Sequence, residues 1–219
     1  MLLLLNLTCP VYASATDKVQ SAVTGEIDYK YIFSLASNMK ETELFKLLEE
    51  YYKPEYRDKQ IALNIALYIT NPVKYESRYV EAFPQDSNAI MYIIFNQFEL
   101  PQMTPSFLYS FDALGKIALK GNRLAVRKTI LGSNNSDGVV AEELCFYCEK
   151  LFQSNLILII EELSKLHVDE RARFNYCILS MVNDDIYSLQ QAVAKIITND
   201  TKVKTVIEEI KSIKPLDVQ

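Results

Sequence analysis

The chain has 219 residues, of which 49% are hydrophobic and 23% charged, a composition too apolar for a disordered protein. Its net charge of −5 argues against binding nucleic acid through bulk positive charge. Because His167 is the only histidine, a histidine charge relay and a histidine-rich metal site are excluded, and no glycine-rich phosphate loop occurs. We therefore expect a folded, non-enzymatic protein without a metal or cofactor.

Residues 1–15 have the features of a secretory signal peptide. A short leucine-rich core, 2–7, precedes Ala13-Ser14-Ala15, which fits the small-x-small cleavage pattern, although no Lys or Arg precedes the leucines. A buried amino-terminal helix and a lipid anchor on Cys9 are the alternatives. We expect an exported protein, periplasmic if bacterial and otherwise secreted, in which 16–219 form a single domain. No apolar run after the leader approaches the roughly 18 residues that span a bilayer.

Apolar residues at helical spacing, separated by short polar breaks, predict an all-α protein of about twelve helices. No long run alternates strictly between polar and apolar residues, as a half-buried strand requires. The expected helices, in chain order, span 26–37, 40–52, 55–70, 73–83, 88–100, 105–121, 122–131, 138–153, 155–166, 169–182, 184–198 and 201–213.

The middle of the chain repeats itself. Asn88, Asn122 and Asn155 each stand where a second helix of a pair should begin, with separations of 34 and 33 residues. A shift of 33 residues also superimposes Phe111 on Leu144. A fixed offset between helical hairpins predicts a stack of repeats, in which each hairpin buries its apolar face against the next.

Helical pairs of this length, with apolar stretches at 61–69 and 90–95 that suit helices buried on most sides, resemble HEAT and armadillo repeats. The resemblance covers roughly residues 55–198 and is architectural. It implies a right-handed α-α superhelix of stacked hairpins whose concave face binds other proteins or peptides. The signature positions of tetratricopeptide repeats, which have a similar length, are not met.

Two cysteines form a CxxC motif at Cys145 and Cys148. A redox motif would lie at a strand-to-helix turn, whereas these residues fall inside an expected helix with Cys148 on its apolar face. With Cys177, three cysteines remain after removal of the leader. We expect them to pack as small buried hydrophobes, although an oxidising compartment could pair two of them.

For binding, tyrosine and arginine are the side chains that protein interfaces favour. The tyrosines expected to line the apolar part of a groove are Tyr51, Tyr52, Tyr75 and Tyr79. Arg123 and Arg127, one helical turn apart, belong to a basic cluster and supply the charge. The alternative for this cluster is a solvated face that pairs with Glu142 or Glu143 of the next repeat.

Adjacent acidic pairs such as Glu161-Glu162 point about 100° apart on a helix, so they suit structural or solvated positions better than acid–base chemistry. The sequence thus favours an exported, non-catalytic scaffold for a protein or peptide partner. Two alternatives remain. One is a structural subunit of a cell-envelope complex, and the other is a helical small-molecule-binding or enzymatic domain whose site is assembled from scattered residues.

Overall fold

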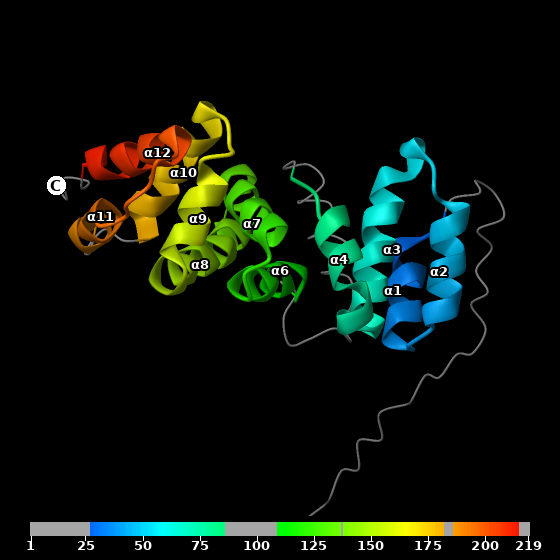
Figure 1. Cartoon of the computed structure of the whole chain (residues 1–219). Helices are drawn as coiled ribbons and strands as arrows, with labels where there is room; N and C mark the ends of the chain where they lie inside the picture. Colours follow the sequence, from blue (N-terminus) through cyan, green and yellow to red (C-terminus); the bar gives the residue numbers. More distant parts are fainter. Residues whose placement is uncertain (1–26, 86–108, 137, 182–185, 215–219) are drawn as a thin grey trace, which may run out of the picture.

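The computed structural model describes residues 27–85, 109–136, 138–181 and 186–214 (Figure 1). Within these ranges the chain forms eleven α-helices and one 3-10 turn and no β-strand, which confirms the all-α fold. The expected signal peptide at 1–15 and the expected helix at 88–100 lie outside the described residues. The elements are α1 (Tyr29–Ser37), α2 (Glu41–Glu50), η1 (Pro54–Tyr56), α3 (Arg57–Thr70), α4 (Pro72–Ala82), α6 (Tyr109–Leu119), α7 (Arg123–Asn135), α8 (Gly138–Ser154), α9 (Leu156–Leu163), α10 (Val168–Met181), α11 (Ile186–Ala194) and α12 (Thr201–Ser212).

Asparagine side chains begin the second helices of two successive hairpins. The side-chain oxygen of Asn122 accepts a hydrogen bond from the Ala125 N–H at 3.0 Å, at the start of α7. Asn155 accepts in the same way from the Leu158 N–H at 3.4 Å, at the start of α9. The predicted caps at these two positions are therefore confirmed, whereas Asn88 lies outside the described residues.

Gly132 does not end α7, contrary to expectation, and the helix continues to Asn135. A Cβ atom at Gly132 would lie 2.8 Å from Cδ1 of Leu144 on α8, so the missing side chain lets two helices approach closely. Gly121, by contrast, has a φ of +95° and follows the end of α6, as a C-terminal cap requires. The sequence alone does not distinguish these two uses of glycine.

The helices after residue 109 pack in two rows. α6 packs against α8 and α8 against α10, while α7 packs against α9 and α9 against α12 (Figure 1). The residues that a 33-residue shift superimposes occupy equivalent core positions: Phe111 and Leu144 are fully buried, and so are Ala118 and Leu151. The α7, α9 and α12 helices thus form one continuous row, which we call the α7–α9–α12 face.

Helices α1–α4 and α6–α12 form two groups that meet at the end of α4 (Figure 1). The Tyr79 hydroxyl donates a hydrogen bond to the Ser110 carbonyl of α6. The rings of Phe83 and Phe111 pack edge to face with centroids 5.5 Å apart. Buried aromatic contacts and a buried hydrogen bond therefore connect the two groups.

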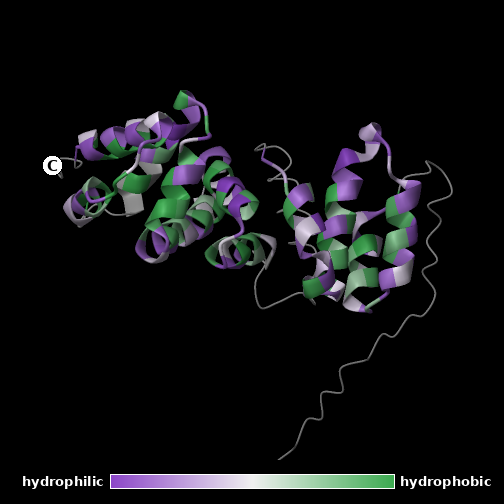
Figure 2. Cartoon of the chain, in the orientation of Figure 1, coloured by the Kyte–Doolittle hydropathy of each residue, from purple (hydrophilic) through white to green (hydrophobic). Residues whose placement is uncertain are grey.

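The helices differ in how far they are buried: α3 is buried on most sides from Ile61 to Thr70, whereas α12 buries one side and exposes the other. On α12, Val203, Val206, Ile207 and Ile210 are buried, and Figure 2 shows the hydrophobic side of this helix turned toward the other helices. This is the pattern of an amphipathic helix at a protein surface. Among the described residues, no helix combines the length and hydrophobicity needed to cross a bilayer.

Candidate functional site

Two of the four tyrosines expected to line a groove belong to the core. The Tyr79 ring is fully buried and stacks on Tyr68 with centroids 4.4 Å apart. Tyr75 is 4% exposed, and its hydroxyl donates a hydrogen bond of 2.7 Å to the Glu41 carboxylate of α2. Burial leaves little of either ring for contact with a partner.

The other two tyrosines lie at the end of α2. Tyr51 is partly buried, packs edge to face on Tyr56 at 5.0 Å, and accepts a hydrogen bond from the Ile27 N–H. Tyr52 is 76% exposed. The structure therefore does not bring the four predicted tyrosines together on one open surface.

Arg123 and Arg127 do meet, on the α7 side of the α7–α9–α12 face. Arg127 donates to one oxygen of Glu162 from Nε at 3.1 Å and from Nη2 at 2.7 Å. Arg123 donates to the other oxygen of Glu162 at 3.1 Å and to Glu161 at 2.6 Å. Two guanidinium groups from one hairpin thus hold two carboxylates of the next.

The expected alternative pairing of this basic face with Glu142 or Glu143 is wrong. Those acids belong to α8, the first helix of the next hairpin, whereas the acids that Arg123 and Arg127 contact belong to α9, the second helix. The second helix of one hairpin, α7, packs against the second helix of the next, α9. The arginines of α7 therefore pair with acids of α9.

Glu162 lies at the centre of this cluster with its side chain fully buried. Burial alone would raise the pKa of its carboxyl, but hydrogen bonds from Lys165, Arg127 and Arg123 outweigh it and hold the pKa below its ordinary value. The carboxylate is thus ionised and saturated with donors at neutral pH. Such a group stabilises the packing of α9 on α7 and is poorly suited to act as a general base.

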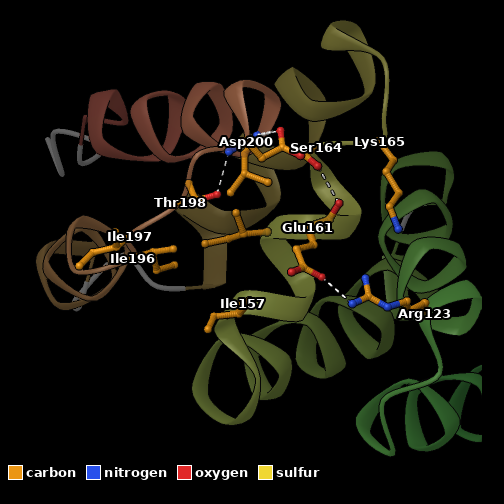
Figure 3. A pocket seen from close by; sticks show the side chains of 11 residues that line it. Arg123, Ile157, Glu161, Ser164, Lys165, Ile196, Ile197, Thr198 and Asp200 are labelled. Atoms are coloured by element: carbon orange, nitrogen blue, oxygen red, sulfur yellow. Dashed lines mark hydrogen bonds and ion pairs between the residues drawn. The ribbon is translucent and has the colours of Figure 1, made fainter.

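Beside this cluster, α9 and the segment that leads into α12 enclose a pocket of about 280 Å³ (Figure 3). Its wall combines four isoleucines and Val203 with charged and hydroxyl side chains, and Ile157 and Ile197 remain 58% and 99% exposed. Lining residues are Arg123, Ile157, Ile160, Glu161, Ser164, Lys165, Ile196, Ile197, Thr198, Asp200 and Val203. The pocket is thus lined by aliphatic and polar side chains in similar measure.

The rim charges already have partners within the chain. Glu161 accepts from Arg123 (Figure 3), and Lys165 donates to Glu162. Asp200 caps α12 by accepting from the N–H groups of Lys202 and Val203. These charged groups are therefore already engaged within the chain, and the aliphatic side chains of the lining are available for an apolar contact.

A second, shallower groove of about 560 Å³ lies between α2 and α4. Phe45 is 36% exposed on its floor, and the Arg78 guanidinium lies 5.2 Å from the centre of that ring. Lys74 forms an ion pair with Glu41 across the groove. Tyr75 lines the groove from α4, so it is the one predicted tyrosine that borders a described hollow.

The two cysteines of the CxxC motif differ. Cys148 is a free, fully buried thiol, and burial raises its pKa to about 12 although a hydrogen bond to Ser133 opposes the shift. Cys145 is disulfide-bonded. Because Cys148 is free, the bond of Cys145 is not made within the motif. The packing interpretation holds for Cys148 and is wrong for Cys145.

We expect Cys148 to resist alkylation in the native protein, because a buried thiol with a raised pKa is neither accessible nor ionised. Denaturation without reductant should expose Cys148 and leave Cys145 unmodified, and added reductant should expose both. Peptide mass spectrometry after iodoacetamide treatment measures each state. A crosslinked Cys145–Cys148 peptide, or alkylation of native Cys148, would contradict the assignment.

His167 lies on the surface where α9 leads into α10, with its Nδ1 atom 3.3 Å from the Asp169 carboxylate. Both side chains are strongly exposed. No group of three or more potential metal ligands occurs among the described residues.

Sequence reasoning missed the residues that shape the pocket. The expected helix at 184–198 would have placed Ile196 and Ile197 on a helix face, whereas α11 ends at Ala194 and both residues lie in the connection to α12. The partners of Arg123 and Arg127 could have been found, because Glu161 and Glu162 follow them at about the spacing of one repeat.

Comparison of the sequence with protein-family models gives no match, and comparisons with curated proteins and with solved structures give no significant match. The function is therefore argued from the geometry of the chain.

Proposed function

We propose that the chain is an exported, non-catalytic helical scaffold that binds another protein or peptide on the α7–α9–α12 face. The observation that carries this proposal is the pair of exposed isoleucines, Ile157 and Ile197, at a partly aliphatic pocket whose charged side chains already have partners within the chain. Exposed aliphatic side chains at the mouth of a hollow suit a partner that inserts an apolar side chain of its own.

The pocket lies at the lower end of the sizes found for small-molecule sites, and it suits a single side chain inserted by a protein partner. Sites for drug-sized ligands usually measure about 300–1,000 Å³ and converge several polar groups on the ligand. This pocket measures about 280 Å³. A single inserted side chain fits that volume, and the rest of a partner would lie across the adjoining helices.

The repeat architecture supports the same proposal. Helices α7 and α9, the second helices of two hairpins, lie in one row with α12 and form an extended surface, which is how α-solenoids present a binding face. We propose that the stack continues as a right-handed superhelix of the HEAT or armadillo type, with α7, α9 and α12 on its binding side. The Asn122 and Asn155 caps and the buried core positions that repeat with them support this architecture.

Export rests on two independent features. The leader-like residues 1–15 indicate secretion, and a disulfide at Cys145 is typical of an oxidising compartment. Both features support the proposal that the protein is exported, periplasmic if bacterial and otherwise secreted.

Replacing Ile197 by aspartate should abolish partner binding, because the charge would occupy an aliphatic contact surface. Ile197 is 99% exposed, so the variant should keep the wild-type melting temperature. Val73 on α4 is 92% exposed and offers a matched control, Val73→Asp, outside the α7–α9–α12 face. Affinity capture from the native envelope or secreted fraction, quantified by mass spectrometry, compares the three baits.

We expect at least one protein to be captured by the wild type and by Val73→Asp and to fall by about tenfold or more with Ile197→Asp. Equal capture by all three baits would keep a binding role but reject this pocket. If the wild type captures nothing above an empty matrix, the scaffold proposal fails, and the small-molecule alternative becomes the one to test.

A further inference from the structure

Two Asn-x-Ser/Thr sequences, the acceptor motif for N-linked glycosylation, lie in the described residues at 134–136 and 199–201. A third, at 6–8, belongs to the expected leader, outside the described residues. Because the motif is short and occurs often by chance, the surroundings of each asparagine decide whether a glycan fits. A glycan is bulky and hydrophilic, so it needs a side chain that is on the surface and has no role in packing.

Asn134 does not meet this requirement. It lies in the last turn of α7, and its Nδ2 atom donates a hydrogen bond of 2.8 Å to the Glu170 carbonyl of α10. Its Oδ1 atom is buried and accepts no hydrogen bond from any described residue. Helices α7 and α10 pack against each other. A sugar on Nδ2 of Asn134 would therefore have to displace α10 from α7.

Asn199 has the opposite surroundings. It is exposed and lies in the irregular connection between α11 and α12. Its side chain makes no hydrogen bond with any described residue. The cap of α12 is provided by Asp200, so the helix does not need the Asn199 amide to begin. Thr201, the third residue of the motif, is exposed as well. A glycan on Asn199 thus disturbs no contact of the described fold.

We propose that Asn199 carries an N-linked oligosaccharide and that Asn134 is unmodified in the folded chain. The proposal rests on the export proposed above, in a secretory pathway that transfers oligosaccharides to asparagine. In this transfer, Nδ2 of Asn199 loses a proton and forms a bond to C1 of the first sugar. The bond between C1 and a diphosphate oxygen of a lipid-linked oligosaccharide breaks, and the lipid diphosphate leaves with the proton.

The glycan would lie beside the pocket on the α7–α9–α12 face. Thr198 and Asp200, the two neighbours of Asn199, both line that pocket (Figure 3). Ile197, which is 99% exposed, precedes Asn199 by two residues. A bulky, hydrophilic group at Asn199 would therefore restrict the approach of a partner from the side of the connection between α11 and α12.

The experiment expresses the full chain in cultured cells with an N-glycosylating secretory pathway and analyses the secreted protein. A peptide N-glycosidase removes N-linked glycans and converts each asparagine that carried one into aspartate. In heavy-oxygen water this conversion labels every occupied site for peptide mass spectrometry. We expect the label at Asn199 and not at Asn134, together with a shift in gel mobility that the glycosidase removes.

Three variants make the test specific. Thr201→Ala destroys the acceptor motif without changing Asn199 and should abolish the glycan, whereas Thr201→Ser keeps the hydroxyl and should retain it. Ser136→Thr gives the motif of Asn134 the same first and third residues as that of Asn199. Asn134 should still be unmodified in this variant, because its structural surroundings are unchanged. Thermal unfolding should give each variant a melting temperature close to that of the wild type.

A secreted, folded chain without a glycan at Asn199, or with one at Asn134, overturns the proposal. If the chain is not secreted, the leader of a host secretory protein takes the place of residues 1–15. A glycan at Asn199 in that chain alone keeps the acceptor site and rejects the proposed export. Absence of the glycan from both chains rejects the site.

Discussion

Replacing Gly115 by alanine should lower the free energy of unfolding by about 3 kcal/mol, the upper range for an overpacked core. Gly115 lies in α6, and a Cβ atom there would lie 2.1 Å from Cδ2 and from Cγ of the Tyr147 ring on α8. That ring is buried, and its hydroxyl donates to the Asp112 carboxylate. Because both ends of Tyr147 are held, the ring cannot withdraw without separating α6 from α8.

Gly121→Ala provides the matched control. Nothing lies within 4 Å of a Cβ atom at Gly121, so only the strain of its φ of +95° opposes the substitution. That strain is worth about 1 kcal/mol. Urea denaturation of both variants compares a glycine required by close packing (Gly115) with a glycine required by its backbone conformation (Gly121). In the Gly115→Ala background, Tyr147→Leu should recover part of the lost free energy of unfolding. Equal losses at the two glycines would show that α6 and α8 are farther apart than described.

Arg127→Ala should be the second most damaging change, with a loss of about 2 kcal/mol. Removing one member of a buried ion pair leaves the other charge poorly compensated, and the Glu162 side chain is fully buried. Arg123 and Lys165 remain, so the loss is smaller than for an isolated pair. Arg123→Ala should cost much less, because the Arg123 side chain is 54% exposed against 33% for Arg127.

The effect of Arg127→Ala should also depend on pH. The pKa of Glu162 is held below its ordinary value of 4.5 in the folded protein, so the unfolded chain takes up a proton first as the pH falls. The stabilisation by this cluster is therefore complete above about pH 4.5 and declines as the pH falls through the folded pKa. Thermal unfolding at neutral and acidic pH should show the gap between wild type and Arg127→Ala closing in acid. A gap that does not change with pH would mean that Glu162 is not the partner.

The helices and the register of the repeat could be predicted because they depend on local sequence. Apolar spacing located ten of the described helices to within a few residues, and the Asn122 and Asn155 side chains fixed where two of them begin. The end of α11 at Ala194 could not be predicted in this way. Ile196 and Ile197 continue the apolar pattern of a helix, yet in the structure they belong to the irregular connection between α11 and α12, beside α9.

The environment of each candidate side chain depends on tertiary packing, and there the sequence was less informative. Tyr52 and Tyr79 are the same residue type on predicted helices, but one is exposed and the other is in the core. Arg123 and Arg127 were expected to lie side by side, and they do. Their acidic partners, however, are determined by the packing of α7 against α9. Lys128 belongs to the same basic run, and only its contact with the end of α4 shows that it is buried.

The positions of Cys145 and Cys148 on α8 constrain the order of events during folding. Exchange of the disulfide onto Cys148 requires that Cys148 be a thiolate and that it reach a sulfur atom of the disulfide. In the native core the Cys148 thiol is buried and its pKa is raised, so it is neither ionised nor accessible. Before α8 packs, Cys145 and Cys148 are both exposed to solvent, and their thiols do not differ in burial. Oxidation that precedes collapse of the core can therefore trap a wrong pairing, whereas oxidation after collapse leaves Cys148 out of the reaction.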